Sequence, residues 1–149
     1  MHTLKIASLA LLTFALTAGA AGQGFKPYPG ATKYTPPDTK ENRELMKAIP
    51  AGTTSTAYIT KDSFEKVVAF YKGSAKEYKM PGMPASRKLP TGQEMKQTFL
   101  IFDGAADITT SKSWAKVQNP FIGSVDFKGG APVYSDVRDL TEIVLAEKK

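Results

Sequence analysis

A short amphipathic segment in the middle of the chain most constrains how this protein can fold. Asp62 is predicted to cap a helix, and Glu65, three residues later, would complete a capping box. A helix with one apolar face needs an apolar surface to lie on, and we expect later strands to supply that surface. The side chains that recur at the i, i+3, i+4 and i+7 positions of this face are Phe64, Val67, Val68 and Tyr71.

Strands are expected on both sides of this helix. The segment at residues 94–103 ends in a continuous apolar run, which is typical of a central strand buried on both faces. Gly129 and Gly130 predict a hairpin turn, and Pro132 confines the following residues to the edge of a sheet. The expected strands are residues 53–60, 94–103, 113–118, 121–127 and 140–147.

One more helix and one long loop complete the prediction. Asp38 or Thr39 is expected to cap a mostly polar helix that ends near Ala48. Residues 76–91 contain three prolines and are expected to form a long loop. The fold class predicted from this order is α+β, with an antiparallel sheet of about four to five strands and two helices packed on one face.

The N-terminus has the pattern of a secretory signal. A lysine at position 5 precedes an apolar stretch at residues 6–16, and small residues follow at positions 18–20. We therefore expect cleavage after residue 20, which leaves a single domain at residues 21–149 that is exported to the periplasm or secreted. The apolar stretch is shorter than the roughly 20 residues of a membrane span, and no later stretch predicts a transmembrane segment.

The absence of two residue types excludes the commonest catalytic centres. The chain has no cysteine, and its one histidine, His2, lies inside the predicted signal. A mature chain without them has no Ser-His-Asp or Cys-His centre and no Cys/His zinc site. Two Ser-x-x-Lys matches, at Ser63 and Ser113, fall on a helix start and a strand, where a structural role is the better interpretation.

A hydrolase that uses carboxylates is the enzymatic alternative. Paired carboxylates can act as acid and base if one of them lies in an apolar pocket. The acidic residues Asp103, Asp107, Asp136 and Asp139 occupy predicted turns and helix or strand starts, where aspartate commonly bonds to the nearby backbone. The composition therefore favours a protein that is not an enzyme, and it predicts no cofactor.

Positive charge makes binding the preferred hypothesis. The net charge is +6, and basic residues gather in the expected loop at residues 76–91. We expect the domain to bind an envelope protein or an anionic polymer, whereas nucleic acid is not expected because no recognised module is present. The residues predicted to contribute are Tyr78, Lys79, Arg87, Lys88 and Trp114.

A second binding hypothesis concerns copper. Met80 and Met83 are three residues apart, and thioethers are soft ligands that suit Cu(I). Two methionines are too few for a site, so Met95 or Met46 would have to join them. The alternative interpretation is that these methionines pack adaptably and hold the loop against the domain.

Three short motifs give the chain a resemblance to other proteins. They are Tyr28-Pro29-Gly30-Ala31 after the signal, Lys66-Val67-Val68-x-Phe70-Tyr71-Lys72 in the predicted helix, and Ser113-Trp114 followed by Asn119-Pro120. With these motifs the chain resembles a group of short exported bacterial proteins of unknown function. The resemblance implies an extracytoplasmic α+β domain, and it implies no catalytic residue.

Overall fold

The computed structural model describes residues 24–149, and the predicted signal at residues 1–20 lies outside them. The described part holds two helices, α1 (Lys40–Lys47) and α2 (Phe64–Tyr71), of eight residues each. The nine strands are β1 (Thr32–Tyr34), β2 (Thr53–Thr60), β3 (Lys76–Tyr78), β4 (Ser86–Lys88), β5 (Glu94–Ile101), β6 (Ser113–Asn119), β7 (Phe121–Lys128), β8 (Ala131–Arg138) and β9 (Thr141–Lys148).

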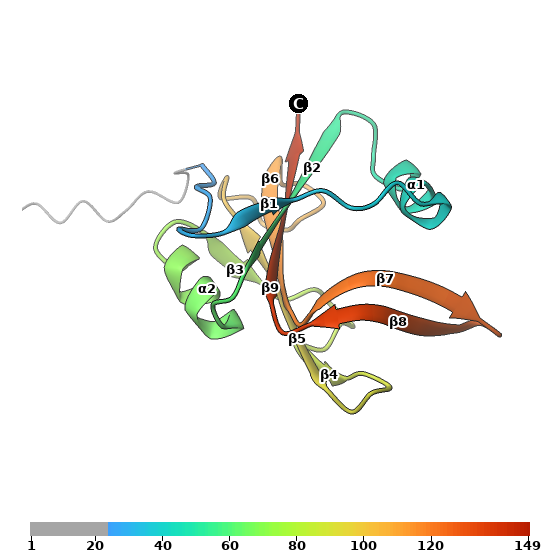
Figure 1. Cartoon of the computed structure of the whole chain (residues 1–149). Helices are drawn as coiled ribbons and strands as arrows, with labels where there is room; N and C mark the ends of the chain where they lie inside the picture. Colours follow the sequence, from blue (N-terminus) through green and yellow to red (C-terminus); the bar gives the residue numbers. More distant parts are fainter. Residues whose placement is uncertain (1–23) are drawn as a thin grey trace, which may run out of the picture.

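Seven strands form one antiparallel sheet, which we call the main sheet. Its order is β1-β2-β9-β6-β5-β3, and β4 pairs with the same edge of β5 as β3 does. The remaining two strands, β7 and β8, form a separate ribbon that extends away from the main sheet (Figure 1). Pro120, which has no N–H to donate to a ladder, stands between β6 and β7.

The predicted fold class is wrong. The protein is β-rich, with nine strands in two antiparallel sheets among the described residues, rather than a four- to five-stranded α+β domain. The expected loop at residues 76–91 contributes two of the additional strands, β3 and β4, because both pair with the free edge of β5. The helices also lie on opposite sides of the main sheet instead of sharing one face (Figure 1).

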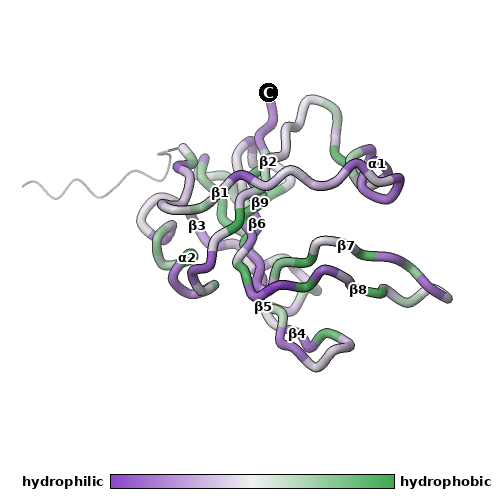
Figure 2. Tube along the Cα trace, viewed as in Figure 1, coloured by the Kyte–Doolittle hydropathy of each residue, from purple (hydrophilic) through white to green (hydrophobic). Residues whose placement is uncertain are grey.

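The amphipathic helix lies on the main sheet as predicted. Val67 and Tyr71 are 0% and 1% exposed and pack against Leu100 of β5 in one apolar cluster. The cluster also contains Ala115, Val117 and Ile143 from the strands and Phe102 just after β5, with Tyr58 packed against it. Hydropathy colouring shows the contrast between the two helices, since α1 is mostly hydrophilic along its length (Figure 2).

The predicted helix cap is displaced by one residue. Ser63, not Asp62, is the N-cap of α2, and its hydroxyl accepts a hydrogen bond from the Lys66 N–H at 3.3 Å. The carboxylate of Asp62 is occupied elsewhere, because it accepts hydrogen bonds from the Tyr28 hydroxyl and the Lys66 ammonium. Glu65 pairs with Lys96 on β5 and therefore does not complete a capping box.

The segment before β1 packs at the junction between α2 and the main sheet. The Phe25 ring packs on the rings of Tyr71 and Phe102, at centroid distances of 5.7 and 5.4 Å. Tyr28 is 5% exposed, and the Tyr71 hydroxyl donates to the Lys26 carbonyl oxygen at 2.8 Å. These contacts hold the entry segment against the domain.

Shortening a side chain that packs beneath α2 should lower the stability of the whole domain. Leu100→Ala is expected to lower the free energy of unfolding by about 2–5 kcal/mol, because it leaves a cavity beneath the buried face of α2. Met46→Ala is the control: Met46 is 55% exposed on α1, and its loss should change stability by no more than about 0.5 kcal/mol. Urea unfolding of both variants measures the difference, and equal losses would contradict this view of the core.

Candidate functional site

The face of the main sheet that points away from α2 carries the most distinctive surface of the molecule. Side chains alternate along a strand, so the neighbours of buried Ala115 and Val117 point to the opposite face. Pairing aligns Phe99 with Lys116 and Lys116 with Val144, so all three lie on this face. Trp114 and Ala146 form the next paired row.

These side chains form the floor of an apolar groove of about 590 Å³, which we call the open-face groove. One wall is the segment after α1, which contributes Ala48, Ile49 and Pro50, and Ile108 comes from the loop before β6. No residue of α1 or α2 lines the groove, and α2 lies on the other side of the sheet (Figure 1). Its volume falls in the range of roughly 300–1,000 Å³ that is typical of small-molecule sites.

The residues that line the open-face groove carry two polar atoms that are buried without a hydrogen-bond partner. They are the indole Nε1 of Trp114 and the hydroxyl Oγ1 of Thr53, the only such side-chain atoms found among residues 24–149. Buried polar groups are nearly always paired in folded proteins, and leaving one unpaired costs about 1–3 kcal/mol. Both atoms belong to residues that line the same groove, which makes this groove the strongest candidate site.

Lys116 places an amine among the apolar side chains of the floor. Burial, the largest cause, lowers the pKa of Lys116, and Arg87 on β4 lowers it further, while Glu142 raises it. Burial also raises the pKa of Glu142, which stands one paired row away on β9. No ion pair joins Lys116 to any carboxylate within 4 Å among the described residues, so the amine has no close counter-ion.

The five residues predicted from the sequence do not form one cluster. Trp114 lies on the floor of the open-face groove, and Tyr78 and Lys79 line a separate small cavity beside β3. Arg87 and Lys88 are exposed on β4, where the Arg87 guanidinium donates to the Tyr134 hydroxyl of β8 at 3.3 Å. The contact ties the β7–β8 ribbon to the edge of the main sheet.

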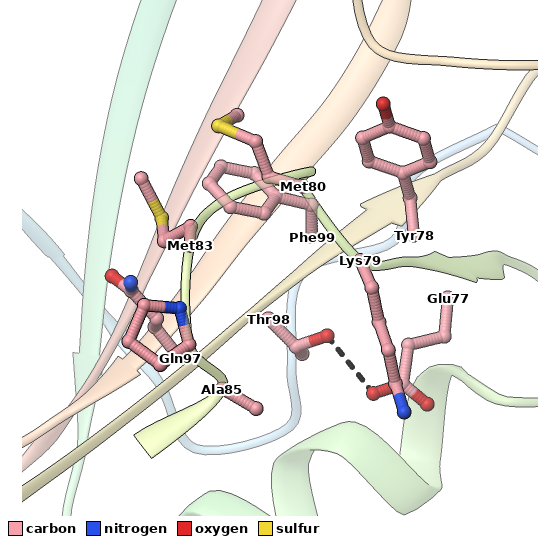
Figure 3. Close-up of a pocket in the computed structure, with 10 residues that line it drawn as sticks. Glu77, Tyr78, Lys79, Met80, Met83, Ala85, Gln97, Thr98 and Phe99 are labelled. Carbon is pink, nitrogen blue, oxygen red and sulfur yellow. Dashed lines mark hydrogen bonds between the residues drawn. The ribbon is translucent and has the colours of Figure 1, made fainter. Parts of the chain in front are cut away.

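The two loop methionines face the same small cavity. Met80 and Met83 form the ends of a tight turn through Pro81 and Gly82, and their side chains lie around the Phe99 ring (Figure 3). Gly82 has a φ of 75°, the value that a type II turn requires at this position. Neither methionine that would have to join them in a copper site lines this cavity: Met95 is 1% exposed on β5, and Met46 is on α1.

The first two aspartates considered as catalytic candidates accept hydrogen bonds within their own loop. Asp103 accepts hydrogen bonds from the Lys112 N–H and the Ser111 hydroxyl, and its pKa is lowered because these bonds outweigh its burial. Asp107 accepts hydrogen bonds from Thr109 and Thr110, which likewise lower its pKa. A carboxylate held ionised in this way is a poor general acid.

The other candidate carboxylates and serines are also in structural positions. Asp136 pairs with Arg138, and Asp139 lies within hydrogen-bond reach of Asn119. Ser63 caps α2, and Ser113 points to the opposite face of β6 from Lys116. The described residues therefore offer no assembled pair for the hydrolase hypothesis.

Sequence reasoning missed the most important residues of the groove. In the sequence, Lys116 belongs to a Ser-x-x-Lys match and shares a strand face with Trp114, and neither pattern indicates a buried amine. Phe99 belongs to the apolar run that predicts a strand buried on both faces, and Val144 belongs to the predicted C-terminal strand. Nothing in their local sequence indicates that one face of the sheet stays uncovered.

Comparison with protein-family models, with curated proteins and with solved structures gives no match, so the function has to be argued from geometry. Within residues 24–149, neither helix is long or apolar enough to cross a membrane.

Lys116→Met is expected to raise the free energy of unfolding at pH 7 by about 1–2 kcal/mol, because it removes a desolvated amine and keeps the apolar stem. The pKa of Lys116 in the folded protein lies below its ordinary value of 10.5, so at neutral pH the unfolded chain binds the proton more readily. The gain should therefore be full below the folded pKa and vanish as the pH rises to about 10.5.

Urea unfolding of both proteins at pH 7 and pH 10.5 measures this gain. Lys148→Met is the control, because Lys148 lines the same groove but its ammonium already donates to the Thr109 carbonyl oxygen. A gain of the same size at both pH values would show that packing, not the amine, is responsible.

Proposed function

We propose that this protein is an exported binding domain, not an enzyme, and that it holds an elongated apolar ligand in the open-face groove. The observation that carries the proposal is the groove itself, an uncovered apolar surface on the floor of a well-packed sheet. Concave and mostly apolar depressions of this volume are the usual form of small-molecule sites in proteins. Export is supported by the signal-like pattern of residues 1–20.

The shape of the surface supports an elongated ligand. A second hollow of about 520 Å³ lies between α1 and β7, and Ala48 lines both this hollow and the open-face groove. The hollow also contacts Val125 and Phe127, and Phe127 is 70% exposed. A ligand that follows both depressions would run from the floor of the main sheet towards the ribbon, as an alkyl chain or another extended molecule can.

Arg87, Lys88 and Lys79 supply positive charge outside the groove. They lie on β4 or beside β3 and are exposed, so binding of an envelope protein or an anionic polymer along this edge stays a prediction. The attraction would be salt-dependent, because exposed charges are screened at physiological ionic strength. The groove differs from this edge in being apolar, so binding there should depend little on salt.

Filling the groove should block binding of an apolar probe. The single tryptophan, Trp114, lies on the floor and reports occupancy by its fluorescence. Titration of the wild-type protein with decanol should shift this fluorescence, and Val144→Phe should weaken decanol binding by about tenfold or more, because the larger ring occupies the floor. Val133→Phe is the control, since Val133 is 40% exposed on β8 and does not line the groove.

No fluorescence response of the wild-type protein to decanol would overturn the proposal. Equal weakening by both phenylalanine variants would also count against it, because the effect would then not depend on the groove. Circular dichroism of each variant checks that the fold is kept.

A further inference from the structure

We propose that the ligand of the open-face groove is a straight-chain carboxylic acid, whose carboxylate binds Lys116 while its alkyl chain lies along the apolar floor. This inference rests on the proposed function and narrows it to one chemical class. It depends on Lys116, whose amine has no close counter-ion, and on two further lining residues, Trp114 and Thr53, whose buried polar atoms have no hydrogen-bond partner.

The first argument is charge. Lys116 stands between Phe99 and Val144 in the paired rows of the floor, and the described residues place no carboxylate within 4 Å of its amine. A cation surrounded by apolar side chains is poorly solvated, and a carboxylate that reaches it supplies both a counter-charge and a charge-assisted hydrogen bond. An alcohol, an alkane or a neutral peptide segment would leave the amine without this partner.

The second argument is hydrogen bonding. The Trp114 N–H can only donate, and the Thr53 hydroxyl can donate or accept, yet both are buried without a partner. Neither atom reaches the surface of the groove, so a carboxylate would meet them only after a side-chain shift. A carboxylate has only acceptor sites, about four lone-pair positions, and therefore suits these unpaired groups better than a donor does. A ligand whose polar end is mainly a donor, such as an alkylamine, would meet the Lys116 charge and be repelled.

The neighbouring charged groups support this assignment. Glu142 lies on the same face and raises the pKa of Lys116, but no ion pair within 4 Å joins the two side chains. Arg87 adds positive charge near Lys116, although its guanidinium already donates to Tyr134. Lys148 also lines the groove, but its ammonium is bound to the Thr109 carbonyl oxygen. Among these three cations, Lys116 is the one without a hydrogen-bond partner, so its amine is available to bind a ligand.

The experiment compares decanoate with decanol, two probes with the same chain length that differ in the charged end. Isothermal titration and Trp114 fluorescence measure both affinities at pH 7 for the wild-type protein. Decanoate is expected to bind at least about tenfold more tightly than decanol. Lys116→Met should remove this preference, whereas Lys116→Arg should keep most of it because the positive charge is retained. Lys72→Met is the control and should leave the preference unchanged, because Lys72 is exposed at the C-cap of α2 and does not line the groove.

Each outcome separates this inference from the proposed function. Equal affinity of the wild-type protein for decanoate and decanol would overturn the carboxylate assignment and leave the groove as an apolar binding site. A preference for decanoate that persists in Lys116→Met would also overturn it. Binding of neither probe would overturn the proposed function itself. Glu142→Gln should keep or increase the preference for decanoate, because it removes a competing carboxyl group on the same face.

Discussion

The packing of α2 against one face of the main sheet is the contact on which the rest of the structure depends. Val67 and Tyr71 of the helix are buried against Leu100 and its neighbours, and Phe25 closes the seam. A helix of eight residues covers only part of one face of a seven-stranded sheet. On the opposite face, short segments form the walls of a groove, and they do not cover its floor.

The open face departs from the rule that a folded chain satisfies its buried polar groups. Lys116, Trp114 and Thr53 all carry polar atoms that lack a close partner, and the first two come from the same strand, β6. Each such group reduces stability, and proteins commonly tolerate local losses of this kind at functional sites. The rest of the domain offsets these losses through the α2 core, so the groove is held on a rigid floor.

The local sequence predicts the parts of this fold that depend on local physics. The stripe of apolar residues in α2, the turn at Gly129 and the strand at the C-terminus follow from spacing, backbone freedom and β-branched composition, and all three are present. The cap of α2 was predicted one residue early, because the sequence does not show that Tyr28, which is 34 residues away, binds the Asp62 carboxylate. The segment at residues 76–91 was expected to be a loop because its prolines conceal two three-residue strands.

By itself the sequence determined that this protein is built without cysteine and that the α2 stripe must rest on a sheet, because composition and helical period are properties of the chain alone. The tertiary structure decided which face of that sheet stays open. Both faces of β5 and β6 carry apolar residues, and only the placement of the single covering helix distinguishes core from groove. Because α2 packs on the other face, Trp114 and Lys116 lie together on the face that forms the groove.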